Sequence, residues 1–249
     1  MNARDPRLPI AGVERSLAER VDSIDWPRVE PELDADGAAV VPRLLEPDDC
    51  AALASLYDDD ARFRSRVVMA RHGFGRGEYR YFARPLPDTV ALLREAFYPR
   101  LVAIANRWQA ALGSDVRYPA THADFIARCH AAGQRRPTPL LLRYGPGDYN
   151  CLHQDLYGDV VFPLQVVVLL SAPGRDFDGG EFVMTEQRPR MQSRPMVLPL
   201  KQGDAAVIAV SQRPVQGTRG SYRVNLRHGV SRVRAGSRHT LGIVFHDAA

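Results

Sequence analysis

The sequence predicts an α+β fold, with helices concentrated in its first half and short strands in its second. Apolar residues recur at helical spacing between Asp88 and Leu112, which predicts one long amphipathic helix. From Pro137 onward the pattern changes to short β-rich runs separated by turns, which is typical of a sandwich or barrel. Because the long helix needs a sheet to cover, we expect one domain over residues 1–249.

The first part of the chain, to about residue 136, is expected to support that sheet. Residues up to about Trp26 are polar and predict a loose helix or arm. Glu46-Pro47-Asp48-Asp49 predicts the start of a helix, with proline near its first turn. Asp124 completes a capping box with Thr121, so another helix is expected from Thr121 to just before Gly133. Three further runs are strand-like, the last two forming a hairpin around the glycine-rich residues 72–77: Ala38–Val41, Arg66–Ala70 and Glu78–Phe82.

Residues 137–249 contain the β runs that are expected to form the core of the domain. Turns such as Gly179-Gly180 and Gln202-Gly203-Asp204 separate them. The expected strands are Leu140–Tyr144, Val160–Leu170, Glu181–Met184, Met196–Leu200, Ala205–Val210, Tyr222–Val230 and Arg238–Phe245.

Composition indicates a soluble globular protein of the cytoplasm. The longest apolar run, Val160–Leu170, is interrupted by Pro163 and Gln165, and it is far shorter than the roughly 20 residues that span a bilayer. The N-terminus carries charges from Arg4 onward and no apolar signal core, so secretion is not expected. The three cysteines are odd in number and widely spaced, which favours reduced thiols.

A candidate metal site begins with His153-Gln154-Asp155. In an extended segment residues i and i+2 point the same way, so His153 and Asp155 can reach one ion. His228 lies within a later β run and would complete a set of two imidazoles and one carboxylate, which is the facial triad that holds Fe(II). The other histidines are rival third ligands, His239 above all because it also lies on a late strand; they are His72, His122, His130, His239 and His246.

Three further residues are placed near this candidate site by their spacing. Arg238, ten residues after His228, is either a solvated arginine at a strand end or a buried arginine whose guanidinium pairs with a carboxylate. Tyr144, on the strand before His153, is either a core aromatic residue or a hydroxyl donor. Alternation aims Cys151 at the same face as His153, although a small buried residue is the simpler interpretation of a free cysteine.

These residues together resemble the Fe(II)/2-oxoglutarate-dependent dioxygenases. The segment Arg143-Tyr144-Gly145-Pro146-Gly147 that leads into Leu152-His153-Gln154-Asp155 looks like that of the AlkB-type nucleic-acid demethylases. Gly179-Gly180-Glu181, Gly203-Asp204 and the basic residue ten after the distal histidine resemble the prolyl-4-hydroxylase-like branch. The resemblance covers about residues 140–246, and it extends to a group of bacterial oxygenases proposed to act on damaged DNA.

The resemblance implies a double-stranded β-helix, or jelly roll, with the N-terminal helices packed on one sheet and residues 137–249 as its metal-binding core. His153, Asp155 and His228 would be the catalytic metal ligands for Fe(II). Arg238 and Tyr144 would bind the co-substrate 2-oxoglutarate, and O2 would be the oxidant. The sequence departs from the AlkB-type pattern at Leu142, where that pattern has asparagine, and at Val244, where it has a second arginine.

The implied reaction is hydroxylation of a C–H bond, and its target is open at this point. Oxidative demethylation of alkylated DNA or RNA bases, a form of DNA repair, is one expectation. A protein side chain or small molecule is the alternative, and a non-catalytic metal-binding jelly roll is a third; no membrane partner is expected. Arginines in two loops would contact nucleic-acid phosphates or else be solvated hairpin tips: Arg188, Arg190, Arg194, Arg213, Arg219 and Arg223.

Overall fold

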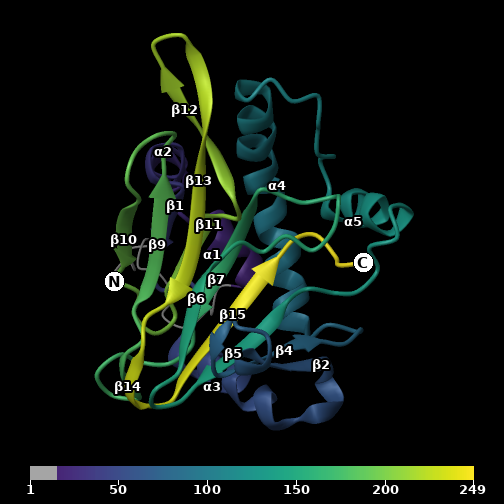
Figure 1. The fold of residues 1–249 in the computed structure, drawn as a ribbon. Helices are drawn as coiled ribbons and strands as arrows, with labels where there is room; N and C mark the ends of the chain where they lie inside the picture. Colours follow the sequence, from purple (N-terminus) through teal and green to yellow (C-terminus); the bar gives the residue numbers. More distant parts are fainter. Residues whose placement is uncertain (1–15) are drawn as a thin grey trace, which may run out of the picture.

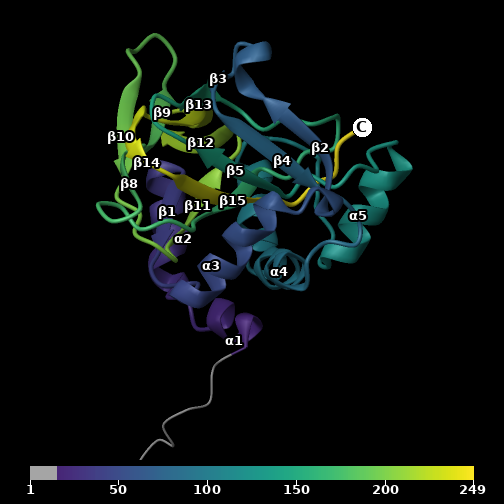
Figure 2. The same ribbon diagram turned by 90° about the horizontal axis from the view of Figure 1, so that it is seen from below.

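Two antiparallel sheets face each other, and helices cover the outer face of the larger sheet (Figure 1). The structure is a computed structural model that describes residues 16–249. In the view from below, α1, α3 and α4 lie on one side of the larger sheet and the strands of the smaller sheet lie on the other (Figure 2). The architecture is therefore a sandwich of two sheets with a helical layer on one side.

The larger sheet has the strand order β1-β11-β7-β15-β5-β4-β2. Strands from the two halves of the chain pair directly in it, since β1 pairs with β11 and β4 pairs with β5. Its strands are β1 (Ala38–Val41), β2 (Phe63–Val68), β4 (Glu78–Phe82), β5 (Leu140–Tyr144), β7 (Leu164–Leu169), β11 (Ala205–Ala209) and β15 (Arg238–Val244).

The smaller sheet has the order β10-β9-β13-β6-β3, with β12 paired to β13 as a long hairpin that projects from the body in Figure 1. Its strands are β3 (Gly75–Arg76), β6 (Tyr149–His153), β9 (Phe182–Gln187), β10 (Arg194–Leu198), β12 (Gln212–Gly217) and β13 (Gly220–Val230). A separate two-stranded ribbon pairs β8 (Phe177–Gly179) with β14 (Val233–Gly236).

The helices begin where the sequence provides caps. The Ser16 side chain and Glu19 form a capping box at α1, and Thr121 caps α5 by accepting from the backbone N–H of Asp124. The helices are α1 (Leu17–Asp22), α2 (Trp26–Asp36), α3 (Pro47–Ser55), α4 (Asp88–Ala111) and α5 (His122–Ala131), with short 3-10 turns at η1 (Leu56–Asp58), η2 (Asp60–Arg62) and η3 (Met69–Arg71). No helix of residues 16–249 is long and apolar enough to cross a membrane.

Most of the elements expected from the sequence are present at nearly the expected bounds. The expected arm before Trp26 lies outside the described residues up to residue 15, and the rest of it forms α1. Two sets of elements were missed. One is α2, whose internal Pro31 and short apolar stripe gave no clear helical signal. The other comprises strands with little apolar alternation, namely β3, β6, β8, β12 and β14.

The long helix α4 is fastened to the larger sheet by a buried ion pair as well as by apolar packing. The guanidinium of Arg94 donates to the carbonyl oxygens of Val244 and Phe245 at the end of β15, each at 2.9 Å. It also contacts a carboxylate oxygen of Asp247 at 2.9 Å, and both side chains are almost fully buried. Burial opposes ionisation, but Arg94, His130 and Arg84 hold the pKa of Asp247 below its usual range.

Asp247→Asn is expected to lower the free energy of unfolding by about 3–5 kcal/mol, because it leaves the buried Arg94 cation without a counter-charge. The folded-state pKa of Asp247 is depressed, so this stability is present above the unfolded pKa of about 4 and is lost as pH falls below it. Urea unfolding at pH 7 and pH 3 measures both effects. Asp178→Asn, which breaks an exposed pair with Arg234, is the control and should change little; equal losses in the two variants would contradict the assignment.

Candidate active site

Two neighbouring strands of the smaller sheet bring the two candidate histidines together. His153 is the last residue of β6, and it is the direct cross-strand partner of His228 on β13. The register shifts between His228 and Val230, at Gly229. A Cβ atom at Gly229 would lie 2.6 Å from the backbone oxygen of Asn150, so glycine is what permits the strands to approach here.

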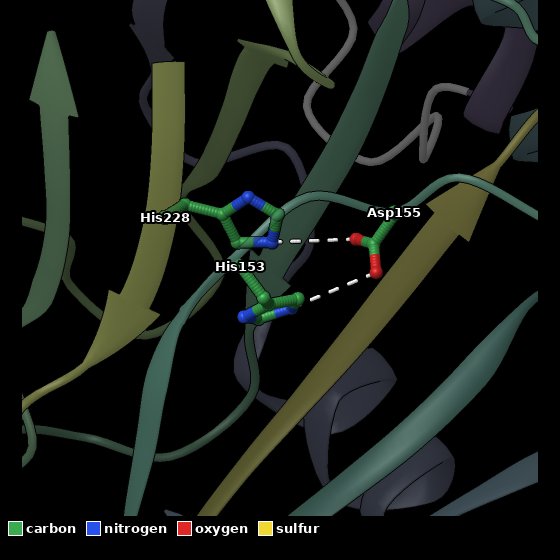
Figure 3. A group of neighbouring side chains, drawn as sticks. All are labelled: His153, Asp155 and His228. Atoms are coloured by element: carbon green, nitrogen blue, oxygen red, sulfur yellow. Dashed lines mark ion pairs between the residues drawn. The ribbon is translucent and has the colours of Figure 1, made fainter. Parts of the chain in front are cut away.

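Asp155 follows the end of β6 and turns its carboxylate toward both imidazoles (Figure 3). The Nε2 atom of His228 lies 3.3 Å from one oxygen of Asp155, and the Nε2 atom of His153 lies 3.6 Å from the other. One atom from each of the three residues lies within 4.8 Å of the others, which suits a single metal ion. Within residues 16–249 this is the one such group of histidine, cysteine and acidic side chains.

The protonation states of His153 and Asp155 suit metal binding. His153 uses Nδ1 to contact the carbonyl oxygen of Cys151 at 2.8 Å, and because a carbonyl only accepts, that nitrogen carries the proton and Nε2 keeps its lone pair. Burial and the neighbouring His228 lower the pKa of His153, which favours the neutral ring. Burial alone would raise the pKa of Asp155, but His228, His153 and a 2.6 Å hydrogen bond from Tyr157 hold it well below its usual range.

A cavity of about 280 Å³ opens beside the three residues, between the two sheets. Alternate residues of β5 and β15 line it, as the two-residue period of a strand requires. Much of the lining is apolar, and it includes Leu142 and Val244, the positions at which the sequence departs from the AlkB-type pattern. The lining residues of β5 and β15 are Leu140, Leu142, Tyr144, Arg238, Thr240, Gly242 and Val244.

Arg238 is a buried cation that faces this cavity without a counter-charge. It is 1% exposed, its guanidinium donates to the Thr240 hydroxyl, and its Nε has no hydrogen-bond partner. Among residues 16–249 no carboxylate lies within ion-pair distance of Arg238. Burial lowers its pKa to about 10, so it remains charged at neutral pH. A buried guanidinium in this condition fits a carboxylate-bearing ligand.

Tyr144 lies opposite Arg238 in the sheet register and is fully buried at the same cavity. Its hydroxyl accepts a hydrogen bond from the Asn150 amide at 3.3 Å, which leaves the phenolic proton to donate. Burial raises the pKa of Tyr144, so that proton is retained at neutral pH. The interpretation of Tyr144 as a core aromatic residue is confirmed, and its role as a hydroxyl donor to a ligand stays a prediction.

The rival histidines do not join the group. His239 faces away from the cavity on β15, packs against Tyr57, and has neighbours Arg238 and Thr240 that face inward. The expectation that Cys151 is buried was wrong: the residue is exposed, because β6 lies near the edge of the smaller sheet and is covered there only by the short β3.

Only part of the arginine set is available for phosphate. Both expectations, phosphate contact and a solvated hairpin tip, were wrong for Arg213, which is 2% exposed in β12 and pairs with the buried Glu186. Strand β12 was not predicted from the sequence, so the inward direction of Arg213 within this strand was missed. Arg188 and Arg194 also pair with Glu186. Three arginines of this set are exposed and have no ion pair within the described part of the chain: Arg190, Arg219 and Arg223.

Three residues of the site were not identified from the sequence. Tyr157 holds Asp155, and Asn150 holds Tyr144. Gln165 is buried in β7 with its amide nitrogen 3.3 Å from Nε2 of His228. A signal for Gln165 was present, because it is the polar residue that interrupts the apolar run of β7.

The mouth of the cavity carries exposed apolar side chains. Phe74, in the loop between β2 and β4, is 48% exposed and stacks on His72. Leu152 is 44% exposed, and both Phe74 and Leu152 line the cavity. The loop is tied to the site, since β3 pairs with β6.

Solved structures of other proteins have a similar fold. The fold is similar to a prolyl-4-hydroxylase from Pseudomonas putida, with a TM-score of 0.54, 16% identity and coverage of 94% of this chain and 100% of that one. It is also similar to an oxidoreductase of the 2OG-Fe(II) oxygenase family from Burkholderia pseudomallei, with a TM-score of 0.51, 19% identity and coverage of 95% of both chains. These likenesses confirm the jelly-roll fold predicted from the sequence.

Closer relatives are found by sequence. An uncharacterized protein of Mycobacterium tuberculosis is 49% identical over 168 residues, which cover 68% of this chain and 72% of the relative. Residues 77–248 match the sequence model of an oxygenase family described as "catalysing oxidative methylation of damaged DNA". The chain therefore belongs to this family of oxygenases, as its resemblances led us to expect.

Proposed function

We propose that this oxygenase is a dioxygenase that uses Fe(II), 2-oxoglutarate and O2 to hydroxylate a C–H bond. The observation that carries the proposal is the His153, Asp155 and His228 group beside a cavity whose far wall holds the unpaired Arg238. Two nitrogens and one carboxylate oxygen suit Fe(II) and leave positions for other ligands. Residues 1–249 would act as a single domain, since strands of both halves share the larger sheet.

The side chains of the site have separable roles in this proposal. His153, Asp155 and His228 would hold Fe(II), which with 2-oxoglutarate and O2 supplies the oxidation of the C–H bond. Tyr157 fixes one oxygen of Asp155 and so orients the carboxylate. Arg238 and Tyr144 would bind the far carboxylate of 2-oxoglutarate by a charge-assisted contact and a donated hydrogen bond. The apolar walls at Leu142 and Val244 exclude water from the reacting end.

For the substrate, we propose an alkylated base in DNA or RNA. The description of the matching family supports this choice. Exposed arginines of the hairpins, Arg219 and Arg223, are available for phosphates. The exposed Phe74 and its stacked partner His72 offer an aromatic surface at the cavity mouth on which an extruded base can stack.

A protein side chain or a small molecule is the second candidate substrate. It is favoured by the apolar cavity wall at Leu142 and Val244. It is also favoured by the ion pairs with Glu186, which engage Arg188, Arg194 and Arg213. A non-catalytic role is set aside, because the chain belongs to a family of oxygenases.

Methylated single-stranded DNA should release formaldehyde when incubated with the protein, Fe(II), 2-oxoglutarate and O2, because a hydroxylated N-methyl group breaks down to formaldehyde and the unmethylated base, which stays in the DNA. Unmethylated DNA of the same sequence is the control. Succinate formation that is stimulated by peptides or metabolites, with no formaldehyde from DNA or RNA, would reject the nucleic-acid substrate and favour the second candidate.

Asp155→Ala is expected to abolish iron-dependent formation of succinate, because the group has no second carboxylate to take its place. The assay is run in buffer without added carboxylate or halide, which can occupy the vacated position. Asp148→Ala removes a partly buried carboxylate elsewhere and is the control. Near-normal turnover by Asp155→Ala would contradict the metal assignment.

Arg238→Ala is expected to weaken 2-oxoglutarate binding by about thirtyfold or more, because truncating one partner of a buried charge pair costs about 2–5 kcal/mol. Titration of the metal-loaded protein by calorimetry measures the dissociation constant. Arg234→Ala, at an exposed arginine paired with Asp178, should bind 2-oxoglutarate normally. An unchanged dissociation constant in Arg238→Ala would remove Arg238 from the site.

A further inference from the structure

The polar side chain of Gln165 lines the cavity, and none of the roles proposed above for the site residues explains its position. It is the one polar residue of β7, a strand that is buried at every position in the middle of the larger sheet. Its side chain is 2% exposed and lines the cavity together with Val167. A glutamine at such a position costs stability compared with an apolar residue unless its amide is hydrogen-bonded.

The amide of Gln165 is poorly satisfied by the protein itself. Its oxygen has no hydrogen-bond partner, and its nitrogen has one contact, the 3.3 Å approach to Nε2 of His228. That nitrogen of His228 lies 3.3 Å from Asp155, so it is the atom that faces the metal position. Once this lone pair is given to a metal, it cannot also accept from Gln165. Both ends of the amide are then free to meet a ligand in the cavity.

The sheet register places Gln165 and Arg238 at opposite ends of the same cavity. Gln165 is the cross-strand partner of Val244 at the last residue of β15, whereas Arg238 is the first residue of that strand. A dicarboxylate that spans the cavity with one end at Arg238 has its other end beside the three metal-ligating residues. There the apolar Val167 and Val244 flank Gln165, whose amide is the nearby donor on this wall.

We propose that Gln165 donates a hydrogen bond from its amide to the 2-oxo acid end of the co-substrate, while Arg238 binds the far carboxylate. The proposal rests on the proposed use of 2-oxoglutarate. It assigns recognition of the two ends of one ligand to two residues on neighbouring strands, β7 and β15. Gln165 thereby becomes a co-substrate-binding residue of this chain.

The test uses two ligands that differ at one end. Pyruvate keeps the 2-oxo acid end of 2-oxoglutarate and lacks the far carboxylate. Calorimetric titrations of Mn(II)-loaded protein, without turnover, give the dissociation constant of each ligand for the wild type, Gln165→Leu and Arg238→Ala. Gln165→Leu should weaken both ligands by about ten- to hundredfold, the range for a hydrogen bond to a charged group. Arg238→Ala should weaken 2-oxoglutarate and leave pyruvate unchanged.

Gln134→Leu is the matched control, because Gln134 is equally buried but has its amide satisfied by Val160 and Asp247. It should lower the melting temperature and leave both dissociation constants unchanged. Gln165→Leu should instead weaken the binding of both ligands and leave the melting temperature equal to or above that of the wild type. The amide oxygen of Gln165 has no hydrogen-bond partner that the substitution could remove.

The results of these titrations distinguish the role of Gln165 from the proposed use of 2-oxoglutarate on which it rests. If the wild type binds 2-oxoglutarate and Gln165→Leu binds both ligands equally well, the role of Gln165 is wrong and the function stands. If Gln165→Leu also loses affinity for Mn(II) to the same extent, the residue acts through His228 and the inference is overturned. If the metal-loaded wild type binds neither ligand, the proposed function fails and the inference fails with it.

Discussion

The pairing of His153 with His228 across two strands is the constraint on which the rest of the site depends. Side chains of a sheet alternate between its faces, so a shift of one residue would turn one imidazole to the opposite side. The register is held by β9, which pairs with Asn225 to Val230 of β13 on one side, and by the close approach of β6 at Gly229 on the other. Asp155 needs no strand of its own, because the chain leaves the sheet directly after His153.

The buried arginines differ in whether a carboxylate of the protein forms an ion pair with them. Arg94 and Arg213 are both buried, and each has a carboxylate, Asp247 or Glu186, that is buried with it. Arg238 is as deeply buried, but among residues 16–249 no carboxylate lies at ion-pair distance from it; the Thr240 hydroxyl and the rings of Tyr144 and Phe177 contact it instead. The two paired arginines hold elements together, whereas Arg238 is available to pair with a carboxylate-bearing ligand in the proposed function.

The elements that could be predicted from the sequence are those whose signal lies within a short stretch of residues. Helix α4 and strands β5 and β15 have strong periodicity, and their bounds were predicted closely. The residues of the metal group were predicted from a short motif and a distant histidine, and the structure brings them together. Strand β6 has no apolar alternation, and the inward face of β12 depends on Glu186 in another strand, so neither was visible locally. Tyr157 and Gln165 were missed because their roles come from contacts with Asp155 and His228.

The short strand β3 has a consequence for the solubility of the protein. Without Gly75 and Arg76, strand β6 would form the edge of the smaller sheet, with free backbone groups next to exposed Cys151 and Leu152. Such an edge invites pairing with another chain, and a two-residue strand is enough to block it. The loop that carries Phe74 to the cavity mouth thus also guards the sheet against self-association. A deletion that widened the entrance by removing this loop would therefore also expose the edge of β6.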